Sequence, residues 1–218
     1  MLTPKQAYAE CARKWPRADP GTLQIVASDP LWALTFARDV IKGPFPEGEA
    51  ALASQADTAL QYAQIVLHGP FPRGEPILVI DAKYAFDYAH TVLHGAFFAG
   101  EAAIAQNPYY AYCYALKVLR GPFPLGEPIL ARCPSYALTY ACDVLRGRFP
   151  ACEPHILKDP GIACSYAVNI LRMSFPQAEN SIYAYGPSGQ KYLSFLHTWR
   201  AQGYEIDPFM YLAFDLRW

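Results

Sequence analysis

The sequence lacks any apolar run of about 18 residues, so no transmembrane helix is predicted. Its first residues carry charges in every turn and lack the apolar core of a signal peptide. Charge is scarce as well: 17% of residues are charged and the net charge is −1, so no global field draws the chain to nucleic acid or to an anionic membrane. With 53% hydrophobic residues the chain is too apolar to be disordered. We expect a folded, soluble, cytoplasmic protein.

The sequence also lacks a CxxC pair, a nucleophile elbow, a P-loop and a GxGxxG motif after a strand. Its six cysteines follow no common spacing, so we predict reduced, buried thiols rather than zinc ligands or disulfides. Asp87, His90 and His94 share one face of a predicted helix, but Thr91 stands where the helix of a zinc protease has glutamate. We therefore predict no metal site, no cofactor and no enzymatic activity.

The 20 prolines and 14 glycines recur at a fixed interval of 26 residues, which is the signature of a repeat architecture. The interval is clearest in a Gly-Pro-Phe-Pro-x-Gly-Glu-Pro phrase, complete at residues 121–128. Its phenylalanine recurs six times without a slip, at Phe45, Phe71, Phe97, Phe123, Phe149 and Phe175. The chain is thus predicted to be a tandem array.

A second phrase, Asp29-Pro30, recurs in degenerate form every 26 residues and predicts the start of a helix. An Asp or Asn side chain accepts hydrogen bonds from free N–H groups at a helix N-terminus, and proline is tolerated at the first helical position. A glycine follows 13 residues after each proline, as at Gly43 and Gly69, and glycine is the usual left-handed residue that ends a helix. Each repeat should therefore begin with a helix, helix A, over about residues 30–42.

Within helix A, two alanines four residues apart enclose an aromatic residue, as Ala33, Phe36 and Ala37 do. With the Val, Ile or Leu that follows, they give the i, i+3, i+4, i+7 pattern of one buried helical stripe. Small alanines let neighbouring helices approach, so we interpret the aromatic ladder as core rather than as a platform for nucleobases. The aromatic residues are Phe36, Tyr62, Tyr88, Tyr114, Tyr140 and Tyr166.

A short apolar segment after each Pro-rich turn, such as residues 76–80, predicts a second helix, helix B, of about two turns. One hairpin cannot bury its apolar face alone and must stack on its neighbours. We predict an all-α fold, an α-solenoid of about seven 26-residue helix-turn-helix repeats over residues 1–185, with a C-terminal helical cap over residues 186–218. The repeats start near residues 4, 30, 56, 82, 108, 134 and 160.

The F-P-x-G-E-P phrase after an A-x-x-Y-A-x-x-V-L-x-G helix, with the variant at residues 15–20, resembles α-helical repeats with a W/F-P-x-A/G-E motif in large bacteriophage and other viral proteins. The resemblance covers residues 1 to about 185 and carries no catalytic motif. It implies a phage protein that acts in the host cytoplasm, as an inhibitor of a host defence factor.

The residue before each glycine position is basic or can become so in six of six repeats: Lys42, His68, His94, Arg120, Arg146 and Arg172. These residues could bind an anionic ligand, or they could stabilise the negative end of the helix dipole. Seven residues later stands an acidic column: Glu49, Glu75, Glu101, Glu127, Glu153 and Glu179. We expect the glutamates to favour the start of helix B and to form ion pairs with the basic column, which favours a structural role for both.

Other positions of helix A vary between repeats and could recognise a partner, among them Arg38 and His90. Solvent-facing drift would give the same variation. Aromatic residues of the C-terminal segment should close the last core face or form an interface, with Trp199, Tyr204 and Trp218 as the candidate interface residues.

These features favour a non-enzymatic scaffold that binds a protein partner through its variable helix faces. One alternative is a sponge that sequesters a small anionic molecule such as a nucleotide signal. Another is a reader of single-stranded RNA, with one repeat for each base; the net charge makes nucleic acid the weaker choice, and no membrane role is expected.

Overall fold

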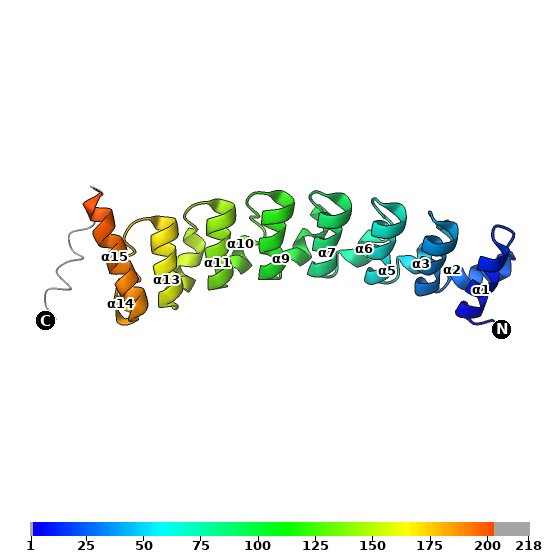
Figure 1. The fold of residues 1–218 in the computed structure, drawn as a ribbon, viewed down its shortest axis with the longest axis horizontal. Coiled ribbons are helices and arrows are strands. Elements are labelled where there is room, and N and C mark those ends of the chain that lie inside the picture. Colours follow the sequence, from blue (N-terminus) through cyan, green and yellow to red (C-terminus); the bar gives the residue numbers. More distant parts are fainter. Residues whose placement is uncertain (1, 203–218) are drawn as a thin grey trace. The chain divides into compact units, whose positions relative to one another are not determined.

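The structure, a computed structural model, describes residues 2–202. These residues form helices and turns and contain no strand, which confirms the predicted all-α fold of 26-residue repeats. They divide into two compact units, one of residues up to 110 with 117–119, the other of residues 111–116 with those from 120 onward. Within each unit, successive A helices stand side by side in chain order, as α3 (Pro30–Phe36) and α5 (Ala56–Gln61) do in the first unit (Figure 1).

Helix A begins where the Asp-Pro phrase predicts. Asp29 accepts a hydrogen bond from the backbone N–H of Trp32 at 3.0 Å, and Asp81 and Asp159 cap their helices in the same way. The α-helical parts of the other A helices are α1 (Pro4–Lys14), α7 (Ala82–Tyr88), α9 (Pro108–Cys113), α11 (Pro134–Tyr140) and α13 (Pro160–Tyr166).

The second half of helix A widens into a π-helix in every repeat after the first, which the sequence does not predict. These segments are η1 (Ala37–Ile41), η3 (Tyr62–Leu67), η4 (Ala89–Leu93), η6 (Tyr114–Leu119), η7 (Ala141–Leu145) and η9 (Ala167–Leu171). At the end of η1, the N–H groups of Lys42 and Gly43 both donate to the carbonyl of Ala37. A single alanine carbonyl thus closes the helix end.

The left-handed residue that ends helix A is the basic residue, and not the glycine that follows it. Lys42, His68, His94, Arg120, Arg146 and Arg172 have φ between 49° and 57°, whereas the only described glycine with positive φ is Gly186. The prediction for the glycines is therefore wrong by one residue. A left-handed conformation costs a residue other than glycine about 1–2 kcal/mol, so this choice of residue needs an explanation.

Helix B is shorter than predicted, because it makes little more than one turn in most repeats. Its α-helical segments are α2 (Pro20–Ala27), α4 (Glu49–Leu52), α6 (Glu75–Leu78), α8 (Glu101–Ile104), α10 (Glu127–Ala131), α12 (Glu153–Ile156) and α14 (Glu179–Ala184). A 3₁₀ turn precedes three of these segments, as η2 (Pro46–Gly48), η5 (Phe98–Gly100) and η8 (Pro150–Cys152). Within the predicted cap, α15 (Pro187–Ala201) follows α14 and packs against it.

The core consists of the regular columns. Both alanine columns, the aromatic column and the phenylalanine column are buried, with exposures between 0% and 5%. Glycine of the Phe-Pro-x-Gly phrase is required by space: a Cβ on Gly126 would lie 2.4 Å from the ring of Phe123 and 3.0 Å from Cβ of Ala111. The phrase therefore folds the phenylalanine ring back over its own turn, against helix A.

Each buried tyrosine connects its helix to the turn of the preceding repeat. The backbone N–H of Phe123 donates to the Tyr140 hydroxyl at 2.8 Å, and this hydroxyl donates to Oε1 of Glu127 at 3.0 Å. The same two hydrogen bonds join Tyr62, Tyr88, Tyr166 and Tyr192 to their preceding turns. We call this arrangement the tyrosine clamp; it satisfies a backbone donor inside the core.

All six cysteines are free thiols, as predicted. Cys11, Cys113, Cys152 and Cys164 are buried, while Cys133 and Cys142 are only partly so. Burial raises the pKa of Cys152 to about 12, which keeps this thiol protonated. In the part of the chain that the structure describes, no helix is long and apolar enough to cross a membrane.

Candidate partner-binding site

The six left-handed residues form a row of exposed basic side chains at the C-terminal ends of successive A helices. We call this row the basic ladder: Lys42, His68, His94, Arg120, Arg146 and Arg172. Each side chain leaves the helix at its last residue, beside the start of the Pro-rich turn. The ladder therefore lies where the helix dipole is negative, and where a folded chain would favour glycine.

The basic ladder forms no ion pair within residues 2–202. The ion pairs found there join Lys14 to Glu10, Arg38 to Asp39, Lys83 to Asp87 and Arg148 to Glu153. In the same range only His94 hydrogen-bonds through its side chain, with Nδ1 3.1 Å from the carbonyl oxygen of His90. The predicted ion pairs between the basic and acidic columns are therefore wrong.

The acidic column turns away from the ladder and serves the tyrosine clamp. Each of its glutamates is the first residue of a B helix, as predicted, and favours the positive end of that helix. Glu75 and Glu127 accept hydrogen bonds from tyrosine hydroxyls at 3.0 Å. Glu153 also binds Arg148 at 2.7 and 3.0 Å, but Arg148 does not belong to the ladder. The acidic column thus leaves the charges of the ladder unneutralised.

Consecutive ladder residues line shared pockets within each unit. In the first unit, a pocket of about 330 Å³ contains Lys42, Gly43 and His68. In the second unit, Arg120, Gly121 and Arg146 line a pocket of about 410 Å³. A third pocket, of about 380 Å³, has Arg146, Gly147 and Arg172 in its wall. Each pocket combines a ladder cation, the glycine after it and the cation of the next repeat.

The other predicted side chains of helix A lie beside the ladder but are already engaged. Arg38 lines the first pocket and binds Asp39 through two hydrogen bonds of 2.7 and 2.9 Å. His90 is exposed, and its ring stacks on Phe86 with centroids 5.5 Å apart. Asp87 pairs with Lys83 at 3.3 Å, so its carboxylate does not join His90 and His94 in a common site.

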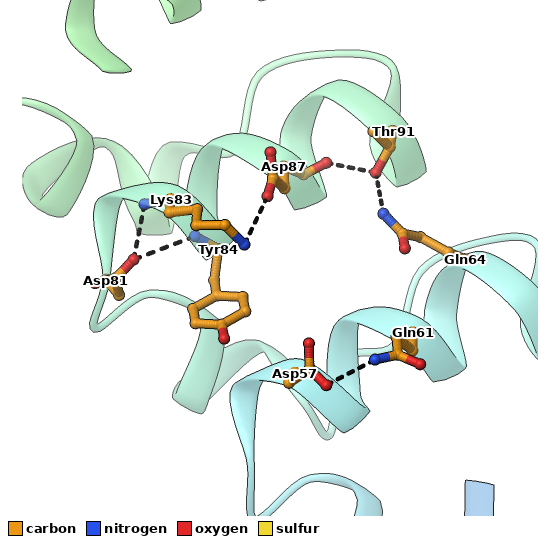
Figure 2. A network of polar contacts seen from close by, with 8 residues as sticks. All are labelled: Asp57, Gln61, Gln64, Asp81, Lys83, Tyr84, Asp87 and Thr91. Atoms are coloured by element: carbon orange, nitrogen blue, oxygen red, sulfur yellow. Dashed lines mark hydrogen bonds and ion pairs between the residues drawn. The ribbon is translucent and has the colours of Figure 1, made fainter. Parts of the chain in front are cut away.

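The outward side of the A helices carries polar contacts that differ between repeats. Figure 2 shows how Gln64 of one repeat reaches Thr91 of the next: the Gln64 amide donates to the Thr91 hydroxyl at 2.7 Å. The Thr91 hydroxyl donates in turn to the backbone carbonyl of Asp87 at 2.6 Å. In the second unit, Tyr112 donates to Asp143 at 2.5 Å. Part of the variable surface thus holds neighbouring repeats together.

Of the cap residues predicted to form an interface, only Trp199 falls within the described part. It is partly buried, and its ring centroid lies 5.6 Å from that of Phe195. The same helix supplies Tyr192, which is fully buried and completes the last clamp. Trp199 therefore extends the aromatic side of a helix that closes the core. Tyr204 and Trp218 lie outside the described residues.

Replacing Arg146 with glycine should change the free energy of unfolding by less than about 1 kcal/mol. Relief of left-handed strain, about 1 kcal/mol, offsets the entropy that glycine adds to the unfolded chain, about 0.5–1 kcal/mol. Urea denaturation measures the difference, with Arg146→Val as the control, because a β-branched residue at this φ should lose more than about 1 kcal/mol. A loss above about 2 kcal/mol in the glycine variant would assign the guanidinium a role in folding.

Sequence reasoning identified the ladder but missed the pockets and the clamp. The pockets depend on which of two adjacent residues is left-handed, and glycine is the default choice for that position. The clamp left one signal in the repeats: where Phe36 lacks the hydroxyl, the motif residue that aligns with the glutamate is Asp19. This carboxylate hydrogen-bonds to Thr22 at 2.8 Å instead.

Comparison of the chain with protein-family models, curated proteins and solved structures finds no match.

Proposed function

We propose that this chain is a non-enzymatic scaffold that binds another protein along the basic ladder. The observation that carries the proposal is the ladder's chemistry: six exposed residues, at positions where glycine is the default, share only their basic character. The carboxylates that could have neutralised them bind tyrosines instead. A complementary, negatively charged surface would supply the missing partners and increase the rate of association.

Variable positions beside the ladder supply the means of choosing one partner. Exposed residues just before the ladder include Asp39, Ile65, Thr91, Lys117, Asp143 and Asn169, which differ in charge, size and polarity. Ile65, Asp143 and Asn169 also line the three pockets. A constant row of cations with a changing neighbour would attract acidic surfaces in general and select among them by local contacts.

The pocket linings favour a protein over RNA. No aromatic ring lines any of the three pockets, and the regular aromatic columns are buried. Proteins that bind single-stranded RNA usually stack bases on aromatic or arginine planes, and a nucleotide sponge needs a comparable wall. With the resemblance to phage repeat proteins, this leads us to propose a host defence factor, met in the host cytoplasm, as the partner.

Charge reversal of three ladder residues tests this function. The variant R120E/R146E/R172E should melt within about 2–4 °C of the wild type, because these exposed side chains have no partner in the described fold. Native mass spectrometry of protein purified from the cells that naturally make it should show a bound protein on the wild type alone. The matched control, R17E/R132E/K158E, reverses three other exposed cations and should retain that protein.

Two results would contradict the proposal. One is a nucleotide or RNA, rather than a protein, that accompanies the wild type and is lost from the charge-reversed variant; strong salt dependence would accompany RNA. The other is a protein that remains bound to both triple variants equally, which would place the interface away from the ladder.

A further inference from the structure

The pocket between Arg146 and Arg172 is the most positively charged of the three. Its lining consists of Cys142, Arg146, Gly147, Asn169, Ile170 and Arg172, with no acidic side chain. Both arginines are exposed and without a hydrogen-bond partner in residues 2–202. Two guanidinium groups and one amide therefore face a space of about 380 Å³ that contains no counter-charge from the described chain.

Glycine in this pocket is not explained by folding. Gly147 does not have a left-handed φ, and a Cβ there would meet only the carbonyl oxygen of Leu145, at 3.8 Å. At the equivalent Gly43, an added Cβ would meet nothing within 4 Å, and Met173 occupies this position in the last repeat. What glycine does is leave the backbone uncovered between two cations, which permits close approach of a ligand.

The size and charge of the pocket define the group that fits. A carboxylate accepts paired hydrogen bonds from a guanidinium, and an asparagine amide can donate one more. The same arrangement of cation, glycine and cation recurs in the pocket of Arg120, Gly121 and Arg146. Arg146 thus belongs to two adjacent pockets, so a ligand with regularly spaced carboxylates could occupy both.

We propose that the pockets of the basic ladder bind an acidic segment of the partner protein, with one Asp or Glu carboxylate in each pocket. This rests on the proposed function and specifies its chemistry. The segment runs across the C-terminal ends of the A helices, and the carboxylate between Arg146 and Arg172 is its anchor. The glycine of each pocket gives the side chain room to reach both arginines.

A short, extended peptide in which glutamate alternates with glycine and serine serves as the probe, labelled for fluorescence anisotropy. It should bind the full chain, and R146E/R172E should weaken it at least about tenfold, or about 1.4 kcal/mol. R132E/K158E is the matched control, because it reverses two exposed cations with the same 26-residue spacing in the same unit. Its affinity should stay within about twofold of the wild type.

Gly147→Met tests the pocket without changing the charge. Because Met173 stands in this position in the last repeat, the variant should fold and melt as the wild type does. It should nevertheless bind the glutamate peptide about fivefold more weakly, since the side chain covers the backbone between the arginines. Unchanged binding by Gly147→Met, or equal losses in the two charge-reversed variants, would overturn the pocket and leave only non-specific attraction.

Further probes separate this inference from the proposed function. A peptide with glutamine in place of glutamate should not bind, and neither inorganic phosphate nor oligouridylate should compete at the concentration of the peptide. Preferred binding of oligouridylate would overturn both proposals. If the glutamate peptide fails to bind while R120E/R146E/R172E still loses its natural protein partner, the acidic-segment inference is wrong and the proposed function stands.

Discussion

Replacing Tyr140 with phenylalanine is expected to lower the free energy of unfolding by about 1–3 kcal/mol, although it removes a single oxygen atom. The phenyl ring preserves the packing of a fully buried residue. What is lost is the acceptor for the Phe123 backbone N–H, 2.8 Å away, and the donor to Glu127. A buried N–H without a partner carries its full desolvation penalty, whereas an exposed one does not. Urea denaturation followed by circular dichroism measures the change.

A double-mutant cycle with Glu127→Gln separates the two hydrogen bonds of the clamp. Glutamine retains an oxygen that can accept from the Tyr140 hydroxyl, so this variant alone should lose less than Tyr140→Phe. The two changes should be less than additive, because both act on the same hydroxyl. If Tyr140→Phe loses less than about 0.5 kcal/mol, the Phe123 N–H has found water, and the clamp is not a source of stability.

The clamp also explains how neighbouring repeats are coupled. Phe123 and Glu127 belong to the turn and the B helix of one repeat, and Tyr140 belongs to the A helix of the next. In repeat proteins, stability depends on the interfaces between neighbours as much as on each repeat. A clamp variant should therefore broaden the unfolding transition as well as shift it, because the array is divided at the weakened interface.

The helices of the fold could be predicted from the sequence because the signals are local. Asp29 and Pro30 act within one turn of the helix they start, and the alanine pairs mark its buried side without reference to any other repeat. The 26-residue period then multiplies a single interpretation across the chain. Errors at one repeat, such as the missing acidic N-cap at Cys133, do not disturb the pattern.

What could not be predicted depends on contacts between segments. Nothing in the pair Lys42-Gly43 tells which residue is left-handed, because glycine is the better choice on local grounds and the lysine adopts the conformation. The hydroxyl of Tyr62 binds a backbone N–H that lies 17 residues earlier in a turn. Periodicity identified this tyrosine as a core residue, but its polar role required the positions of both segments.

The candidate site was predictable only in part for the same reason. The basic character of the ladder is visible in the sequence, but its lack of ion pairs became apparent only when Glu75 and Glu127 were found bound to tyrosines. The column arithmetic placed opposite charges seven residues apart and suggested that they pair. A helix end and a turn separate them, and the two side chains serve different surfaces.

Alkaline conditions are expected to unfold the protein between about pH 10 and pH 12, through the tyrosine clamps. Burial raises the pKa of Tyr88 and of Tyr140 to about 12, helped by the hydrogen bonds and charges of Glu75 and Glu127, from an unfolded value of 10.0. Burial raises the pKa of the other clamp tyrosines as well: Tyr62, Tyr166 and Tyr192.

The sign follows from the raised pKa values. A neutral phenol is favoured in the folded state, so its contribution to stability is fully present below pH 10 and is lost as the pH rises through the folded pKa near 12. A tenfold difference in acidity between the folded and unfolded states corresponds to about 1.4 kcal/mol, and a typical domain has only about 5–15 kcal/mol of stability in total. Several clamps that weaken together over the same range of pH should therefore exhaust the stability.

The measurement follows tyrosinate absorbance and helical circular dichroism through one pH titration. The buried tyrosines should ionise together with the loss of helix, in a transition steeper than that of a single proton, because the unfolded chain releases several. In the variant Y88F/Y140F, the starting stability is lower but its slope with pH between 10 and 12 is smaller, since two of the titrating groups are gone. Complete tyrosine ionisation near pH 10 with the helices intact would show that the hydroxyls are accessible to solvent and that the clamps do not resist ionisation.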